Sequence, residues 1–275
     1  MGVIPVTLAI IACNEEDRIG RAIESVVGVN EVLVLDSGSS DATVSVAESL
    51  GARVIQTDWP GYGAQKNRAL AAATQPWVLF LDADEWADAS LADSLAKLED
   101  MDSEICGFAV KRRNRWLGQP LRGGCMGPSW KVRLARVDRA RWEGGILHET
   151  LEVQGRVERL QGLLEHDPYR RVEDQRETAL EYAQLFARKS MAEGRRAWWL
   201  EPSARAVLHF VKSILLRAGF RDGVLGWRLA WKGACEVALK WSLLRSLQGK
   251  PPGSSGFSGG RHAPCNDTEM GGAAR

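Results

Sequence analysis

Short polar segments directly follow three of the apolar runs in the first 85 residues of the chain. They carry Asn14 and Glu15 after the first run, Asp36 after the second, and Asp82 and Asp84 after the fourth. Continuous apolar runs are typical of parallel strands buried on both faces, and ligands bind beyond the carboxyl ends of such strands. Capping and solvation also collect polar residues at strand ends, but three such segments on one edge of a sheet favour a ligand site.

The spacing of Asp82 and Asp84, one residue apart in an extended segment, suits a phosphorylated ligand bound through a metal ion. A carboxylate about 4 Å from a phosphate oxygen costs roughly 4 kcal/mol in repulsion at an effective dielectric constant of about 20. The chain has neither G-x-G-x-x-G after its first apolar run nor G-x-x-x-x-G-K-[ST] anywhere, so both common glycine-rich phosphate loops are missing. A diphosphate at this edge therefore needs a divalent cation, and oxygen ligands together with substrate phosphates suit Mg²⁺ or Mn²⁺.

The elements that must position these residues alternate along the first hundred residues. Apolar runs predict strands at 6–12, 32–35, 53–56 and 77–81, and helical spacing predicts helices at 17–27, 41–50 and 64–73. This alternation with short connections predicts an α/β fold, with a mainly parallel sheet and helices on both faces. Further along, two segments alternate like strands, 107–112 and 131–137. Helices are expected from 172, over 204–218 and over 224–247.

The length of 275 residues suffices for one large α/β domain and an appendage. We expect a site-bearing domain over 1–170, a C-terminal helical region over 171–249, and a disordered Pro/Gly/Ser-rich tail over 250–275. Charge follows this division, because residues 1–110 carry 6 Lys/Arg against 18 Asp/Glu, whereas residues 195–250 carry 11 against 3. The acidic charge of the first region and the basic charge of the last indicate that the two regions have different functions.

The basic C-terminal region combines cations with tryptophans. On one continuous helix, a single face would hold Arg217, Arg221, Arg228 and Lys232. Trp227 and Trp231 would lie beside that face and Trp241 further round, although three nearby glycines favour a kinked helical pair. This composition is typical of helices that lie on an anionic membrane surface. The alternatives are packing of the helices on the first domain with Trp in the core, and nucleic-acid binding. We expect no nucleic-acid partner, because no such motif occurs and the rest of the chain is acidic.

Cysteine usage and the N-terminus indicate the cellular compartment. The five cysteines are scattered without a CxxC pair, which argues against a disulfide scaffold and a thiolate zinc site. The apolar run 3–12 has no preceding basic residue and meets acidic residues at once, unlike a signal peptide. No window of 18 uncharged apolar residues occurs. We therefore expect a cytoplasmic protein, peripheral on the inner face of the cytoplasmic membrane.

Three motifs, in this order, resemble those of the family 2 glycosyltransferases. They are IIACNE at 10–15, VLDSGSSDAT at 34–43 and FLDADE at 80–85. The resemblance runs to about residue 245 and implies the GT-A fold and a nucleotide-sugar donor. WPGYGAQKNRAL at 59–70, LHE at 147–149 and HDPYR at 166–170 are similar to a bacterial subgroup that adds a β-linked glucose to the lipopolysaccharide core.

The resemblance also implies roles for individual residues. Asp36 would contact the nucleotide base or ribose, and Lys66 would lie near the base. Asp82 and Asp84 would hold the metal and the diphosphate. His166 is a further candidate metal ligand, with a surface or capping histidine as the alternative. The predicted nucleotide-sugar site comprises Asn14, Glu15, Asp36, Lys66 and Asp82.

The chain departs from the family in its expected catalytic base. Many members carry an acidic pair followed by Q-x-x-R-W, and no Q-x-x-R-W occurs here. An inverting transfer needs a base that deprotonates the acceptor hydroxyl, and Glu149 is the candidate. His148 would orient this base or bind the metal. The alternative is that both are ordinary polar groups at a strand end. The Gly-rich stretch 118–127 could close over the donor, bind an anionic acceptor or form a flexible surface loop.

These features predict an inverting, metal-assisted glycosyltransferase. It would move a hexose, with glucose implied by the resemblance, from a UDP-sugar to a lipid-linked saccharide such as lipopolysaccharide core. The enzymatic alternatives are a polyprenyl-phosphate sugar synthase, whose phosphate acceptor would need no base, and a transferase for another surface glycan. A catalytically inactive GT-A scaffold at the membrane is the non-enzymatic alternative.

Overall fold

A computed structural model describes residues 4–98, 104–145 and 148–248 of the chain. These residues form two compact units, one of residues 4–98, 104–112, 130–145 and 148–166, and the other of residues 113–129 and 167–248. The division near residue 167 lies close to the predicted boundary at 170, but the segment 113–129 belongs to the second unit. The predicted tail 250–275 lies outside the described residues.

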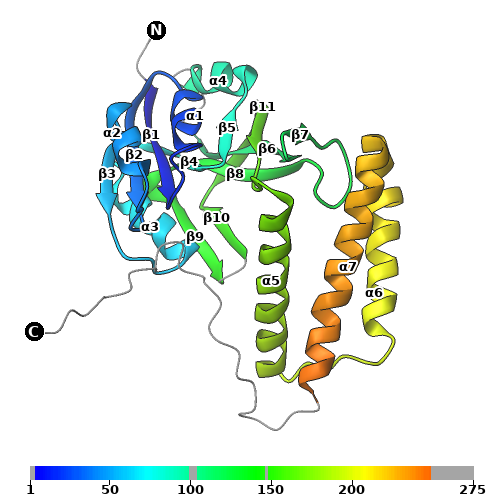
Figure 1. The fold of residues 1–275 in the computed structure, drawn as a ribbon. Helices are drawn as coiled ribbons and strands as arrows, with labels where there is room; N and C mark the ends of the chain where they lie inside the picture. The colour runs from blue at the N-terminus through cyan, green and yellow to red at the C-terminus, as the bar shows by residue number, and fades with distance from the viewer. Residues whose placement is uncertain (1–3, 99–103, 146–147, 249–275) are drawn as a thin grey trace, which may run out of the picture. The chain divides into compact units, whose positions relative to one another are not determined.

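The first unit is built on a sheet whose first half is parallel. Four strands lie side by side in the order β3-β2-β1-β4, with the bounds β1 Ile4–Ala12, β2 Val29–Asp36, β3 Arg53–Gln56 and β4 Trp77–Asp82 (Figure 1). All three pairings are parallel. Asp36 pairs with Ala12, and Asp82 pairs with Ile11. The carboxyl ends of β1, β2 and β4 therefore meet at one edge, as the sequence predicted.

The sheet continues beyond β4 with strands of mixed direction. The order runs on through β8, β6, β11 and β5, with the bounds β5 Glu85–Ala87, β6 Ile105–Trp116, β8 Ser129–Arg136 and β11 Arg156–His166. β8 is antiparallel to β4, and β5 is antiparallel to β11. A separate antiparallel hairpin joins β9 Ala140–Gly145 to β10 His148–Val153, after the short 3-10 turn η2 Val137–Arg139.

Alternating side chains of the central strands fill two cores, one on each face of the sheet. Leu8 and Ile10 point to the face covered by the helices α1 Ile19–Glu24, α2 Thr43–Ser49 and α4 Ala89–Leu95. Ala9 and Ile11 point to the opposite face, which α3 Tyr62–Ala72 covers together with the β9/β10 hairpin. A strand buried on both faces is apolar at nearly every position, which is why β1 has no polar alternation. Its buried polar residue, Thr7, donates its hydroxyl to the carboxylate of Glu31. The prediction of helices on both faces is confirmed.

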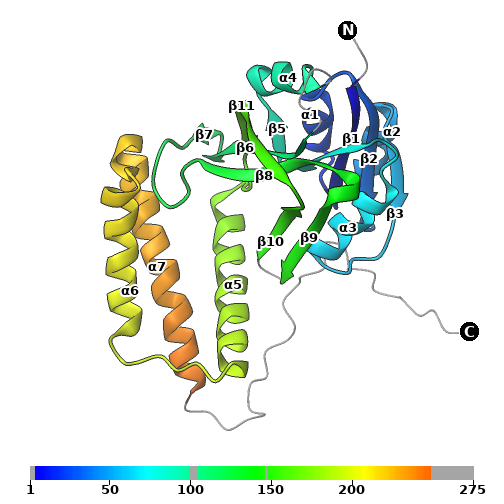
Figure 2. The same ribbon diagram turned by 180° about the vertical axis from the view of Figure 1, so that it is seen from behind.

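The second unit is helical. Its elements are α5 Val172–Ala192, α6 Glu201–Val211, the π-helical turn η3 Lys212–Leu216, the 3-10 turn η4 Gly219–Asp222 and α7 Gly223–Leu247. α7 packs against both α5 and α6 (Figure 2). Ala218 adopts φ +53° between η3 and η4, so the chain reverses there and the expected kinked pair forms. None of the helices in the described part of the chain is both long and apolar enough to cross a membrane.

The Gly-rich stretch is packed into this second unit, where β7 Gln119–Pro120 pairs with the end of β6. The backbone N–H groups of Arg122 and Gly123 donate to the carboxylate of Asp222 at 2.8 and 3.0 Å. A Cβ at Gly123 would lie 2.2 Å from the carbonyl oxygen of Ala218. Glycine is required here because two backbone segments touch, which gives this part of the stretch a structural role.

Candidate functional site

The loops after β1 and β2 are tied to each other at the edge of the sheet. Asn14, at φ +55°, accepts a hydrogen bond from the backbone N–H of Ser40 at 2.9 Å. Asp36 is fully buried, and its Oδ2 accepts from the backbone N–H groups of Gly38 and Ser39, each at 2.9 Å. In the absence of a ligand these two side chains therefore shape the loops, and direct contact of Asp36 with a base or ribose stays a prediction.

Asp82 lies between two buried cations. Its Oδ1 is 2.9 Å from Nζ of Lys66, and its Oδ2 is 3.0 Å from Nη2 of Arg133. Burial by itself would raise the pKa of Asp82, but the charges of Lys66 and Arg133 outweigh it, so that pKa lies well below its usual range. The carboxylate of Asp82 is thus ionised and fixed in direction at any ordinary pH.

Lys66 connects Asp82 to the candidate base. It is buried at the start of α3, and its Nζ lies 3.2 Å from Oε1 of Glu149 on β10. The same ammonium lies 4.6 Å from the ring of Trp142, which packs edge-on against Phe80 in the core. Lys66 therefore contacts two carboxylates and an aromatic ring, and its place near a nucleotide base stays a prediction.

Glu85 organises the charges around Asp82. It is fully buried, and its Oε2 accepts a hydrogen bond from the backbone N–H of Asp82 at 3.1 Å. Its Oε1 forms two ion pairs, 2.7 Å from Nη2 of Arg133 and 3.2 Å from Nη1 of Arg112. The ion pairs with Glu85 and Asp82 raise the pKa of Arg133 against the effect of its burial. Sequence reasoning missed Arg133 and gave no role to Glu85, the last residue of the FLDADE motif. The inward position of Arg133 in the alternating segment 131–137 was the available signal.

Asp84 meets His166 across the sheet. In the register of the antiparallel pair β5/β11, His166 lies opposite Glu85, so Asp84, the residue before Glu85, comes beside the imidazole. Nε2 of His166 lies 3.5 Å from Oδ2 of Asp84, and both side chains are partly exposed. Burial would raise the pKa of Asp84, but the charge and hydrogen bond of His166 lower it further than burial raises it.

Glu15 approaches this pair through an arginine. Nε of Arg18 lies 3.8 Å from Oε2 of Glu15, and its Nη1 lies 3.9 Å from Oδ2 of Asp84. Arg18 is buried immediately before α1. The predicted site residues of the first unit therefore form two sets of contacts. One set joins Glu15 to Asp84 and His166 through Arg18, and the other joins Asp82 and Glu149 through Lys66.

Three predicted residues, His148, Asp36 and Asn14, are placed differently from the rest. The structure describes the backbone of His148, which pairs with Gly145 in the hairpin, but not its side chain, so its predicted role remains a proposal. Asp36 and Asn14 accept hydrogen bonds from the backbone of Ser39 and Ser40 and so shape the loops after β2 and β1. The other predicted residues fall into two sets of contacts: Glu15, Asp84 and His166 in one, and Lys66, Asp82 and Glu149 in the other.

The residues present can hold a divalent cation only with help from a ligand. Across 4–98, 104–145 and 148–248, no group of three or more His, Cys, Asp or Glu side chains could hold a metal ion. Asp84 and His166 supply two converging groups. Mg²⁺ and similar ions are commonly bound by one or two carboxylates and completed by substrate phosphates and water. The pair therefore fits an ion that arrives with a diphosphate.

Comparison with known proteins identifies relatives over most of the chain. Residues 7–149 match the family described as Glycosyl transferase family 2. The lipopolysaccharide core biosynthesis glycosyltransferase LpsC of Rhizobium meliloti (strain 1021) is 30% identical over 241 residues, which cover 85% of this chain and 87% of that protein. An uncharacterized glycosyltransferase of Rickettsia felis is 40% identical over 114 residues, 41% of this chain and 37% of that protein.

Solved structures also show similarity over part of the chain. Glucosyl-3-phosphoglycerate synthase from Mycobacterium tuberculosis, in complex with Mn²⁺, UDP and glucosyl-3-phosphoglycerate, is 31% identical with a TM-score of 0.34, over 40% of this chain and 44% of that chain. A mycobacterial protein is 21% identical with a TM-score of 0.41, over 66% of this chain and 74% of that chain.

Proposed function

Since the chain belongs to glycosyl transferase family 2, and is therefore a glycosyltransferase, we propose that it moves a hexose from a UDP-sugar to a lipid-linked saccharide of the lipopolysaccharide-core type. The name of the Rhizobium relative supports the acceptor class, and the motif resemblance supports UDP and glucose. The observation that carries the proposal is the meeting of Asp84 with His166 beside the chain of contacts Glu149–Lys66–Asp82. We place the reaction at the cytoplasmic face of the inner membrane.

Asp84 and His166 would hold the divalent cation, which neutralises charge on the diphosphate as it leaves. The imidazole in this pair suits a transition-metal ion such as Mn²⁺ better than Mg²⁺. Asp82, held by Lys66 and Arg133, would instead accept a hydrogen bond from a sugar hydroxyl or from water. Asp82 and Asp84 would thus have different roles, because Asp82 contacts two cations whereas Asp84 contacts His166.

Glu149 would act as the general base. Its carboxylate would take the proton of the acceptor hydroxyl as that oxygen attacks the anomeric carbon and the UDP departs with the bonding electrons. Lys66, 3.2 Å away, would fix the orientation of Glu149. This arrangement favours a hydroxyl acceptor over a polyprenyl phosphate, which needs no base.

The test is calorimetry of the full chain against UDP, UDP-glucose and GDP-mannose, with Mn²⁺ and with EDTA. We expect UDP and UDP-glucose to bind only with the metal, and His166→Gln to lose most of this metal-dependent binding. Asp58→Asn is the matched control, because Asp58 is an exposed acid of the same unit that pairs with Arg68. Absence of nucleotide binding by folded protein would overturn the proposal and favour an inactive scaffold.

The acceptor is tested separately. The protein is incubated with UDP-glucose, Mn²⁺ and either deacylated lipopolysaccharide core or a polyprenyl phosphate, and products are identified by mass spectrometry. We expect a hexose added to the saccharide. Transfer to the polyprenyl phosphate alone would favour the synthase alternative and remove the need for Glu149 as a base.

A further inference from the structure

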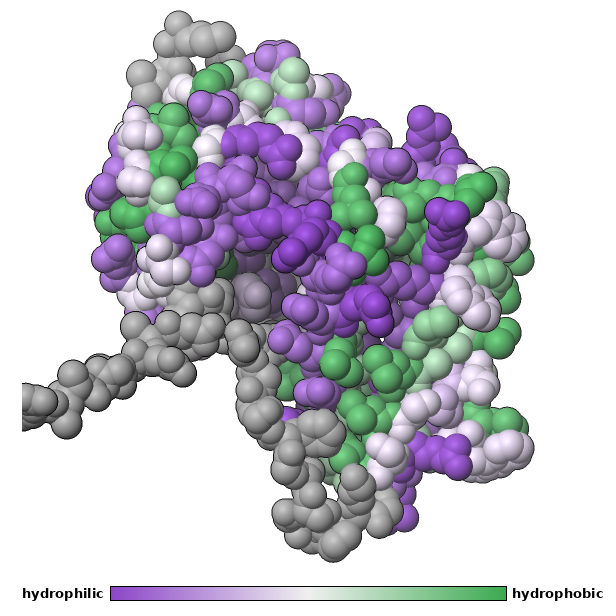
Figure 3. All heavy atoms as spheres, viewed as in Figure 1, coloured by the Kyte–Doolittle hydropathy of each residue, from purple (hydrophilic) through white to green (hydrophobic). Residues whose placement is uncertain are grey.

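Nine large apolar side chains of the second unit are exposed on neighbouring elements, and each is between 40% and 78% exposed. We call this set the apolar face: Val207, Leu208, Val211, Leu215, Leu216, Phe220, Val224, Trp227 and Trp231. Figure 3 shows apolar side chains in green over α6 and α7, interspersed with polar ones. The largest apolar patch of a typical monomer is about 300–600 Å² and is commonly functional.

The apolar face is continuous across the two helices. On α6 and η3, residues 207, 208, 211 and 215 recur at helical spacing, and on α7 residues 224, 227 and 231 do the same. The ring of Phe210 on α6 lies 5.8 Å from that of Trp227 and 6.3 Å from that of Trp231. This aromatic cluster joins the two stripes into one surface.

Exposed cations accompany the apolar face on the same elements. They are Lys212, Arg217, Arg221 and Arg228. Two carboxylates of this region have partners other than these four cations. Asp222 accepts hydrogen bonds from the backbone N–H groups of Arg122 and Gly123, and Glu201 forms an ion pair with Arg205 at 2.7 Å. The surface therefore presents apolar groups and positive charge together.

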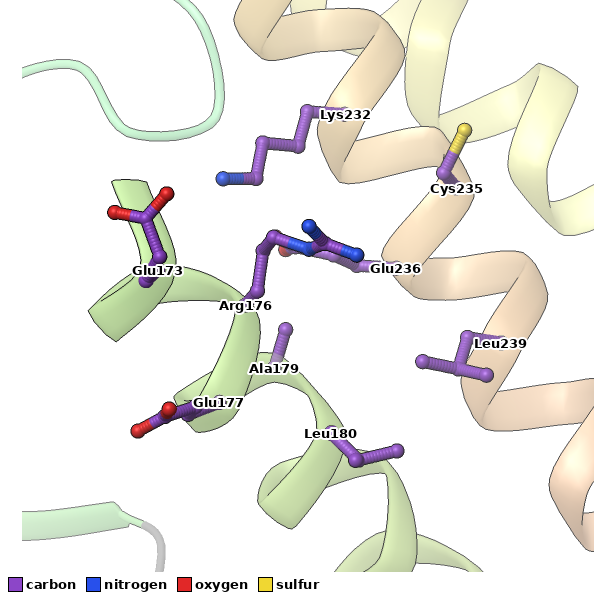
Figure 4. Close-up of a pocket in the computed structure, with 9 residues that line it drawn as sticks. All are labelled: Glu173, Arg176, Glu177, Ala179, Leu180, Lys232, Cys235, Glu236 and Leu239. Carbon is purple, nitrogen blue, oxygen red and sulfur yellow. The ribbon is translucent and has the colours of Figure 1, made fainter. Parts of the chain in front are cut away.

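Lys232, which was expected on the cationic face, and Trp241, which was expected further round the helix, both lie away from this surface. Nζ of Lys232 lies 2.6 Å from Oε1 of Gln175, and Lys232 lines a groove of about 530 Å³ between α5 and α7 (Figure 4). Trp241 is buried against Phe186, with the guanidinium of Arg205 3.9 Å from its ring centre. The amphipathic surface is formed instead by the outer sides of α6 and α7.

We propose that the apolar face docks on a bilayer that carries anionic lipid headgroups. Trp, Phe and Leu side chains with flanking Lys and Arg are the composition of helices that lie in the membrane interface. Charge complementarity selects this occupant over a second copy of the chain, because two copies would bring the same four cations together. Each cation near an anionic leaflet contributes roughly fivefold in affinity. The inference concerns attachment alone and stands apart from the transfer reaction.

The test measures binding of the full chain to sedimenting vesicles of phosphatidylcholine alone and of phosphatidylcholine with 30% phosphatidylglycerol. We expect binding to the anionic vesicles that weakens as salt rises. The double variant Leu216→Glu/Val224→Glu should weaken it at least tenfold, and Arg221→Gln/Arg228→Gln should weaken it about 25-fold at low salt. Val27→Glu is the control, because Val27 is 64% exposed but lies in the first unit.

Metal-dependent UDP binding by each variant reports that the fold and the nucleotide site are intact, independently of attachment. Equal binding to both kinds of vesicle, or wild-type vesicle binding by Leu216→Glu/Val224→Glu, would overturn the proposal. So would a wild-type dimer that the same double variant converts to a monomer, because the face would then be covered by a second copy of the chain.

Discussion

Replacement of Glu85 by alanine tests whether the buried charges hold the site together. Glu85 has no exposed surface and Arg133 is 4% exposed, and the substitution removes the closest carboxylate of that guanidinium. Removal of one partner from a buried ion pair costs about 3–5 kcal/mol, because the other charge stays buried. Arg133 keeps Asp82 at 3.0 Å, so we expect a loss near ~3 kcal/mol in the free energy of unfolding.

Thermal and urea denaturation measure this loss. A domain of this size loses about 2–4 °C in melting temperature per kcal/mol, so Glu85→Ala should melt about 6–12 °C below the wild type. The matched control is Asp138→Ala, because Asp138 is 61% exposed and pairs with Arg136 and Arg139 at the surface. Such surface pairs contribute about 0–1 kcal/mol.

A double-mutant cycle separates the charge from the packing. If an uncompensated Arg133 causes the loss, Glu85→Leu/Arg133→Met should be less destabilised than the sum of its single variants. Metal-dependent UDP binding should fall in Glu85→Ala, because the backbone of Asp82 loses its acceptor. Melting of Glu85→Ala within 2 °C of the wild type would refute the reasoning.

Three further predictions concern a base, a strand and a pH-dependent contact. Glu149→Gln should lower kcat, measured by steady-state kinetics, at least a hundredfold. Its affinity for UDP-glucose, measured by calorimetry, should stay within about twofold of the wild type. Transfer at the wild-type rate would contradict the assignment of Glu149 as the base. Gly162→Ala should destabilise by at least ~2 kcal/mol in urea denaturation, because Gly162 has φ +100° and a Cβ there would lie 2.2 Å from the backbone nitrogen of Leu91. Burial opposes ionisation of Glu31, but the hydrogen bonds that its carboxylate accepts outweigh burial and lower its pKa from 4.5 to about 2. The ionised Glu31 therefore stabilises the fold above pH 4.5, and this stabilisation is lost as the pH falls toward 2. Urea denaturation should find Glu31→Gln less stable by up to ~3 kcal/mol at pH 7, with the gap narrowing below pH 4.5; a gap that is constant with pH would contradict this account.

Local patterns along the sequence were sufficient for the first half of the sheet. The apolar runs predicted β1 to β4, and their alternation with helices predicted that the strands run parallel. The signal was clearest in β1 and β4, because strands buried on both faces are nearly continuous apolar runs. Asp36 and Asp82 were placed at one edge because the strands run parallel. The antiparallel strands β9, β10 and β11 were missed, because their polar, partly exposed segments lack a continuous run.

In the C-terminal region, composition gave the correct class of element, but periodicity did not show where Lys232 and Trp241 lie. Helices over 204–218 and 224–247 were expected and are observed as α6 with η3 and as α7. The direction of each side chain depended on the reversal at Ala218 and on packing against α5, which turned Lys232 and Trp241 away from the exposed side. Periodicity on one helix contains no information about its partner helix.

The sequence by itself determined the family, the parallel half of the sheet and the acidic edge, because each depends on residues that are close along the chain. Only the tertiary structure decided which groups meet there. Asp84 and His166 are brought together by the register of β5 against β11, and Glu149 reaches Lys66 because the β9/β10 hairpin packs on α3. The register of distant strands follows from how their side chains fill the shared core, and that filling involves the whole unit at once.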